Sequence, residues 1–196
     1  AMNPGGTPVA SLNNAVNRLG FNLVRTVSTA FALRQLSRDN SLGAIRPDLE
    51  QVWKTSNEVA SICYAVAKQA FGRQPDEAMM AGLLHSIGRL YILMHAHRID
   101  PTIRQDPGFA YTLETWQPVI GKAILEAWGL PQRICEAVEN QDYLLDGGSA
   151  DLEPLTRLLS AAKRQRRLEA EPALRVQHPD AEFLLQRVNL GKGSFM

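Results

Sequence analysis

Apolar residues recur at steps of three and four positions along almost the whole chain. One such stripe comprises Leu12, Ala15, Val16, Leu19, Leu23, Val24, Val27 and Phe31. A second comprises Val52, Trp53, Ser56, Val59, Ala60, Cys63, Val66, Ala67 and Ala70. This spacing puts side chains on one face of an α-helix, and no stretch alternates convincingly as a strand would. The sequence therefore predicts an all-α fold, a compact helical bundle.

Prolines and polar clusters divide the rest of the chain into further helices and loops. A helix is predicted to open at Pro75 and to run toward Met94. Pro118 and Pro131 each suit the first turn of a helix. The remaining pattern predicts helical turns at 155–162 and 179–188, and loops at 39–47, 99–108 and 146–149.

The composition is that of an ordinary globular protein. The chain has 196 residues, of which 45% are hydrophobic and 21% charged, with a net charge of +1. No apolar run approaches the roughly 20 residues that span a bilayer, and the start of the chain lacks a signal sequence. Cys63 and Cys135 lie in apolar helical patterns, which favours buried free thiols in a reducing cytoplasm over a disulfide. We predict a cytoplasmic protein that does not bind membranes.

The stretch LLHSIGRL contains the histidine of most interest, His85. Helical metal sites pair histidine with aspartate, because imidazole nitrogen and carboxylate oxygen suit divalent transition metals. Here Ser86 stands where that aspartate would be, and the predicted helix over residues 52–71 has no histidine to help. His95 and His97 are two residues apart, so they do not share a helix face. The favoured interpretation is a core histidine, hydrogen-bonded within the bundle.

Sequence motifs for nucleophilic or nucleotide chemistry are missing. Ser86 follows His85, but neighbours in a regular helix do not face each other. The chain has no G-x-S-x-G elbow, no phosphate-binding P-loop and no G-x-G-x-x-G motif. We therefore predict no catalytic residue.

One basic cluster stands out late in the chain: Arg157, Lys163, Arg164, Arg166 and Arg167. It is a possible contact for phosphate or for an acidic protein surface. The alternative is the solvated face of a helix, partly neutralised by the glutamates that follow, and this is the favoured interpretation. Nucleic-acid binding is not favoured, because no aromatic residues are interleaved for bases to stack on.

The three tryptophans divide into two kinds. Trp53 and Trp128 have core-like spacing and are predicted to be structural. Trp116 lies beside the expected helix start at Pro118 and is predicted to be partly exposed.

Several stretches, taken in order, resemble the HDOD family, a degenerate branch of the HD-domain superfamily. They are VASLNNAVNRLG with the helix after it, VWKTSNEVASICYAVA, MMAGLLHSIGRLYIL and VIGKAILEAWGLPQRICEAVENQ. The resemblance covers roughly residues 9 to 165 and implies a helical bundle of the HD-domain type. It further implies an HDOD-like domain over residues 11–170 without its N-terminal helical subdomain. Residues 1–10 would be a linker or a cloning remnant, and 171–196 a C-terminal segment with a short helix.

The resemblance also implies where a metal site would lie. In catalytic HD phosphohydrolases and HD-GYP phosphodiesterases, histidines and aspartates hold the metal. In this sequence, the resemblance places those ligand positions at Thr55, His85-Ser86, Gln117, Asn140-Gln141 and about 160–163. Only His85 is a metal-ligating residue type, so we expect a vestigial pocket with no metal or other cofactor. Its residues would be Thr55, His85, Ser86, Gln117 and Gln141.

HDOD proteins are regarded as non-catalytic modules of bacterial signalling, so the resemblance implies a scaffold that acts through protein contacts. Its partners would be proteins such as receiver, GGDEF or EAL domains, in cis or in trans. Two alternatives stay open. One is a metal-dependent HD-type phosphohydrolase or phosphodiesterase with unusual ligands. The other is a nucleotide-sensing or nucleic-acid-binding module that uses the basic run over 157–167.

Overall fold

The structure is a computed structural model of the 196-residue chain. It describes residues 28, 40–71, 75–143 and 152–170. Some predicted segments lie wholly or almost wholly outside these residues: the helical stripe over 12–31, the loop at 146–149 and the short helix over 179–188.

The described residues form helices and turns, with no strand among them. The α-helices are α3 (Arg46–Val66), α4 (Pro75–Leu84), α5 (Ile87–Ile99), α6 (Phe109–Ala127), α7 (Gln132–Glu139) and α8 (Pro154–Ala170). The shorter elements are the 3-10 helices η1 (Asn40–Ile45) and η3 (Ile103–Gln105) and the π-helical turn η2 (Ala67–Phe71). Within the described part of the chain, the all-α prediction is confirmed.

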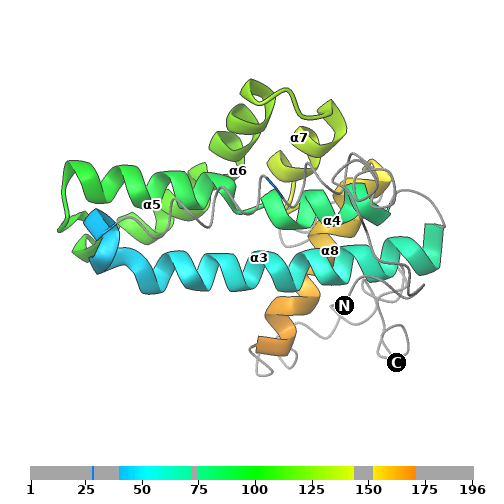
Figure 1. Ribbon diagram of the computed structural model, residues 1–196, viewed down its shortest axis with the longest axis horizontal. Coiled ribbons are helices and arrows are strands. Elements are labelled where there is room, and N and C mark those ends of the chain that lie inside the picture. The colour runs from blue at the N-terminus through cyan, green and yellow to red at the C-terminus, as the bar shows by residue number, and fades with distance from the viewer. Residues whose placement is uncertain (1–27, 29–39, 72–74, 144–151, 171–196) are drawn as a thin grey trace, which may run out of the picture.

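Helix α3 lies along the length of the bundle (Figure 1). It begins with Pro47 in its first turn, where the missing N–H of proline costs no intrahelical hydrogen bond. Its buried side chains follow the predicted stripe: Leu49, Val52, Ser56, Val59, Ala60, Cys63 and Val66. Figure 1 shows α4 and α5 along one side of α3, and α8 crossing it. Helix α3 is therefore the base on which α4 and α8 pack.

The predicted helix from Pro75 toward Met94 is interrupted in its middle. His85 and Ser86 form a turn that separates α4 from α5, and Ser86 has φ −100° and ψ 13°, outside the helical range. The prediction of one continuous helix is therefore wrong. A periodic apolar pattern does not reveal such a break, because both halves keep the helical spacing.

The interruption separates two glycines that pack on different helices. A Cβ atom on Gly82 of α4 would lie 2.5 Å from the Cα atom of Ala60 in α3. A Cβ atom on Gly88 of α5 would lie 2.0 Å from the carbonyl oxygen of Gln117 in α6. Only glycine allows such close approaches, so α4 is fitted to α3 and α5 to α6.

Pro118 lies in the middle of α6, so the prediction that it opens a helix is wrong. The chain enters the helix earlier, where the Gly108 N–H donates to the Asp106 carboxylate at 2.6 Å. The buried side chains of α6 recur every four residues: Leu113, Gln117, Gly121 and Leu125. Burial of this stripe outweighs the one backbone hydrogen bond that proline cannot donate. Pro131 directly precedes α7, close to its predicted place.

The core gathers apolar side chains from all the described α-helices. Cys63 and Cys135 lie in it as buried free thiols, as the sequence predicts. Trp116 is 53% exposed, as predicted, but Trp128 is 44% exposed, so its assignment to the core is wrong. Trp128 caps the surface end of α6, where Gly129 turns the chain at a φ of 67°. None of the described helices is long and apolar enough to cross a bilayer.

Candidate functional site

A groove of about 1070 Å³ lies between α3, α5, α6 and α8, beside the end of α7. Four residues predicted for a vestigial site line it together: Thr55, His85, Ser86 and Gln117. Asn140 lines it as well. Gln141 does not line the groove, but its side chain bonds to the backbone of His85. Helices that are distant in sequence therefore bring the predicted positions to one place.

His85 is buried at the turn between α4 and α5, with both ring nitrogens engaged. Its Nδ1 lies 2.7 Å from the carbonyl oxygen of Gly82, and its Nε2 lies 2.8 Å from Ser86 Oγ. A carbonyl oxygen only accepts hydrogen bonds, so Nδ1 carries the proton and Nε2 accepts from the serine hydroxyl. This is the hydrogen-bonded core histidine that the sequence favours.

The contact between His85 and Ser86 was not expected from the sequence. In a regular helix, adjacent side chains point in different directions. Ser86 has left the helical conformation, and this lets its hydroxyl reach the ring beside it. The expectation that these neighbours do not meet is therefore wrong, because it assumed an unbroken helix.

The His85 ring is held in its neutral form. Burial lowers its pKa to about 3, and the positive charges of Lys163 and Arg166 act in the same direction. The hydrogen bond to Gly82 opposes this shift. A histidine with so low a pKa is neutral near pH 7, so it lacks the matched pKa of a general acid or base.

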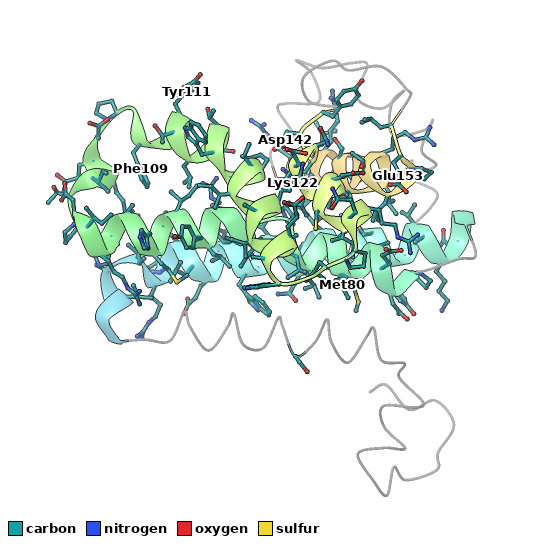
Figure 2. All side chains as sticks on the ribbon, turned by 90° about the horizontal axis from the view of Figure 1, so that it is seen from above. Met80, Phe109, Tyr111, Lys122, Asp142 and Glu153 are labelled. Carbon is teal, nitrogen blue, oxygen red and sulfur yellow. The ribbon has the colours of Figure 1, made fainter. Side chains whose placement is uncertain are left out.

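A chain of hydrogen bonds links this turn to α7 and α8. Gln141 Nε2 donates to the carbonyl oxygens of His85 at 2.9 Å and Val138 at 2.8 Å. Gln141 Oε1 accepts from Lys163 Nζ at 2.7 Å, and the same ammonium donates to Asp142 Oδ1 at 2.6 Å. Figure 2 shows Asp142 beside α8. The lysine thus places a positive charge next to the residues predicted for the site.

The basic run is not a solvated helix face, so the favoured interpretation of it is wrong. Arg164 is buried, and the Lys163 side chain is only 15% exposed. Lys163, Arg166 and Arg167 line the groove, and Arg166 pairs with Glu58 of α3 at 2.8 Å. The cause is tertiary: α8 packs across α3, and this covers positions that the sequence marks only as charged.

The other charges in the groove wall are also paired. Arg89 of α5 forms an ion pair with Glu114 of α6 at 2.5 Å, and Gln117 donates to the same carboxylate at 2.8 Å. Glu139 pairs with Lys122 at 2.6 Å. Apart from the exposed Arg167, the charged side chains that line the groove are therefore held in pairs of opposite sign.

The donor set does not fit a divalent metal. Among the described residues, no group of three or more His, Cys, Asp or Glu side chains is placed to hold one. Thr55, Gln117 and Asn140 offer only neutral oxygens and nitrogens, and the Nε2 lone pair of His85 already accepts a hydrogen bond. The Lys163 ammonium adds a repulsive charge nearby.

Several groove residues were missed from the sequence: Arg89, Tyr111, Glu114, Asp142 and Tyr143. Their side chains lie on separate elements, and nothing in their local spacing indicates that they meet. Lys163 and Arg166 were noted only as members of a charge run. Their spacing with Arg167, at positions i, i+3 and i+4 of a helix, was the available signal that they share a face.

Comparison with known proteins agrees with this architecture. A family model described as the HDOD domain matches residues 2–144. The structure is similar, with a TM-score of 0.69 and 25% identity, to a chain from Shewanella amazonensis SB2B named "putative metal-dependent phosphohydrolase". The match covers 95% of this chain and 66% of that one, so this chain spans just under two thirds of that relative's length. No curated protein matches the chain.

Proposed function

The chain belongs to the HDOD domain family, and from this membership we propose that it is a non-catalytic member that acts by binding other proteins. The structural neighbour and the family match agree on an all-α fold of the HD-domain type. The sequence resemblance implies a role in bacterial signalling, with receiver, GGDEF or EAL domains as candidate partners. The buried free thiols support a place in the reducing cytoplasm.

One observation carries the non-catalytic part of the proposal. The groove keeps the His85 imidazole but uses its Nε2 to accept the Ser86 hydroxyl, while Lys163 brings an ammonium to the same wall. A metal-dependent phosphohydrolase needs a metal to activate water and to polarise the phosphate. The neutral side chains at the other predicted ligand positions, together with the Lys163 ammonium, oppose binding of that metal.

The main alternative is a metal-dependent hydrolase with unusual ligands, and the name of the structural neighbour motivates it. The test is the metal content of the purified protein after incubation with Mn²⁺, Fe²⁺ or Zn²⁺ and desalting. We expect far less than one metal ion per chain, and no metal-dependent hydrolysis of cyclic dinucleotides.

The control for this test is a pair of histidine variants. His85→Ala removes the groove histidine, and His95→Ala removes an exposed histidine of α5 outside the groove. One metal ion per chain in the wild type and in His95→Ala, but not in His85→Ala, would contradict the proposal.

A further inference from the structure

Three cations of α8 project into the groove from one face of the helix. Lys163, Arg166 and Arg167 occupy positions i, i+3 and i+4, and residues at this spacing are neighbours on a helix surface. All three line the groove. We refer to them as the basic face of α8.

Carboxylates already occupy part of this face. Lys163 pairs with Asp142 at 2.6 Å, and Arg166 pairs with Glu58 at 2.8 Å. Arg167 is exposed, and it makes no ion pair with any residue that the structure describes. Two of the three cations are therefore already paired with carboxylates, and Arg167 is the one open to a carboxylate from outside.

The rest of the groove has room for an extended segment of a partner chain. Its volume of about 1070 Å³ lies at the upper end of the roughly 300–1,000 Å³ of typical ligand pockets. The amide side chains of Gln51, Gln117 and Asn140 line it, and each already donates one hydrogen bond within the chain. A side-chain amide has a second N–H and an oxygen, and these can bond to a peptide backbone. Tyr111, which also lines it, is 77% exposed and points away from the bundle in Figure 2, so it offers an aromatic surface at the rim.

The charges of the groove favour the carboxylates of a peptide over a phosphate compound as the ligand. Glu114, Glu139 and Asp142 lie in the same walls as the basic face. A di- or polyphosphate concentrates several negative charges in one place. Asp142 and Glu58 already pair with Lys163 and Arg166, so Arg167 is the one cation of the basic face without an ion pair among the described residues. The side chains of an acidic peptide carry single charges spread along a backbone, so they can meet the cations and avoid the carboxylates.

We propose that the groove between α3, α5, α6 and α8 is the docking site for an acidic peptide segment of a partner protein. The inference rests on the proposed function, because it assigns a place and a chemistry to the protein contact. The partner's carboxylates bind Arg167 and share Arg166, while its backbone bonds to the groove amides. Electrostatic complementarity of this kind favours one class of partner over others.

The test is selection of random peptides, displayed on phage, against the purified full chain. We expect the selected peptides to be enriched in Asp and Glu relative to the starting library. A fluorescently labelled synthetic copy of the most enriched peptide then gives a dissociation constant. Arg167→Glu should weaken its binding about tenfold, because an attractive charge becomes a repulsive one.

Two further variants test whether the peptide binds in the groove. Arg98→Glu reverses an exposed charge of α5 that does not line the groove, and it should leave the dissociation constant within about twofold. Arg166→Gln removes a second cation of the basic face and should weaken binding. Thermal melting of each variant shows whether the fold is intact.

Some outcomes would overturn the inference. Peptides without acidic enrichment would do so, and so would binding that Arg167→Glu leaves unchanged. Displacement of the selected peptide by micromolar inorganic pyrophosphate would assign the groove to a small phosphate ligand instead. None of these results bears on metal content, so failure of this inference is distinguishable from failure of the non-catalytic assignment.

Discussion

Among single residues, His85 is a side chain of a type common in active sites that here forms hydrogen bonds within the fold. Both of its ring nitrogens are used, one toward Gly82 and one toward Ser86. Its backbone carbonyl accepts from Gln141, so the residue also joins the α4–α5 turn to α7. A histidine in such a setting stabilises the fold only in its neutral form, and this makes the stability depend on pH.

The pH dependence has a definite sign. The pKa of His85 is lowered from 6.5 to about 3 in the folded protein, so between these values the unfolded chain binds more protons. Stability from this residue is therefore present above pH 6.5 and is lost as the pH falls toward 3. We expect it to contribute about 2 kcal/mol less at pH 5 than at pH 7.

Urea unfolding of the wild type and of His85→Gln at both pH values measures this contribution. The variant should lose about 2 kcal/mol less than the wild type over this interval, because glutamine does not titrate. Equal losses would show that other groups cause the pH dependence.

At the scale of elements, the close contacts of glycines fix how the helices meet. Gly88 of α5 lies so near the backbone of α6 that even a methyl group has no room. Helix α8 is fixed differently, by apolar burial together with the pairs Lys163–Asp142 and Arg166–Glu58. The groove is lined by α5 and α6 on one side and by α8 on the other. A change in either set of contacts should therefore alter the shape of the groove.

Gly88→Ala tests the first kind of contact. The added Cβ would lie 2.0 Å from the Gln117 carbonyl oxygen, and backbone cannot move aside as a flexible side chain can. We expect a loss of about 3 kcal/mol in the free energy of unfolding, measured with urea. The matched control is Gly43→Ala in η1, where nothing lies within 4 Å of the added atom. Similar losses in both variants would contradict the packing account.

At the scale of the whole molecule, one core spans all the described α-helices and should open in a single step. Cys63 of α3 and Cys135 of α7 are both buried in this core. Burial raises the pKa of Cys63 to about 12 and raises that of Cys135 as well. Since the thiolate is the reactive form, neither thiol should react in the folded state.

Reaction with the thiol reagent DTNB tests this cooperativity. Both thiols should react slowly and at one common rate, set by global unfolding. The Cys63→Ser and Cys135→Ser variants each keep one thiol, so they give the reaction rate of each cysteine separately. Fast reaction of Cys135 alone would show that α7 opens separately from α3.

The helical class and the buried stripe of α3 could be predicted from the sequence alone, and the resemblance to a family indicated which residues would lie near His85. These follow from local rules: helical periodicity marks a buried face, and the order of short patterns marks a family. The sequence did not reveal the turn at His85 and Ser86 or the course of α6 through Pro118. Both depend on packing against other helices, which outweighs local preference.

The burial and the ion-pair partners of the basic run depend on how the helices pack. Arg164 and Arg167 are near neighbours in sequence, yet one is buried and the other exposed, because α8 packs across α3. Lys163 reaches Gln141 and Asp142 only because α7 and α8 lie together. The sequence shows which residues are charged. The ion-pair partner of each residue depends on contacts between helices, and these contacts form only when the chain folds.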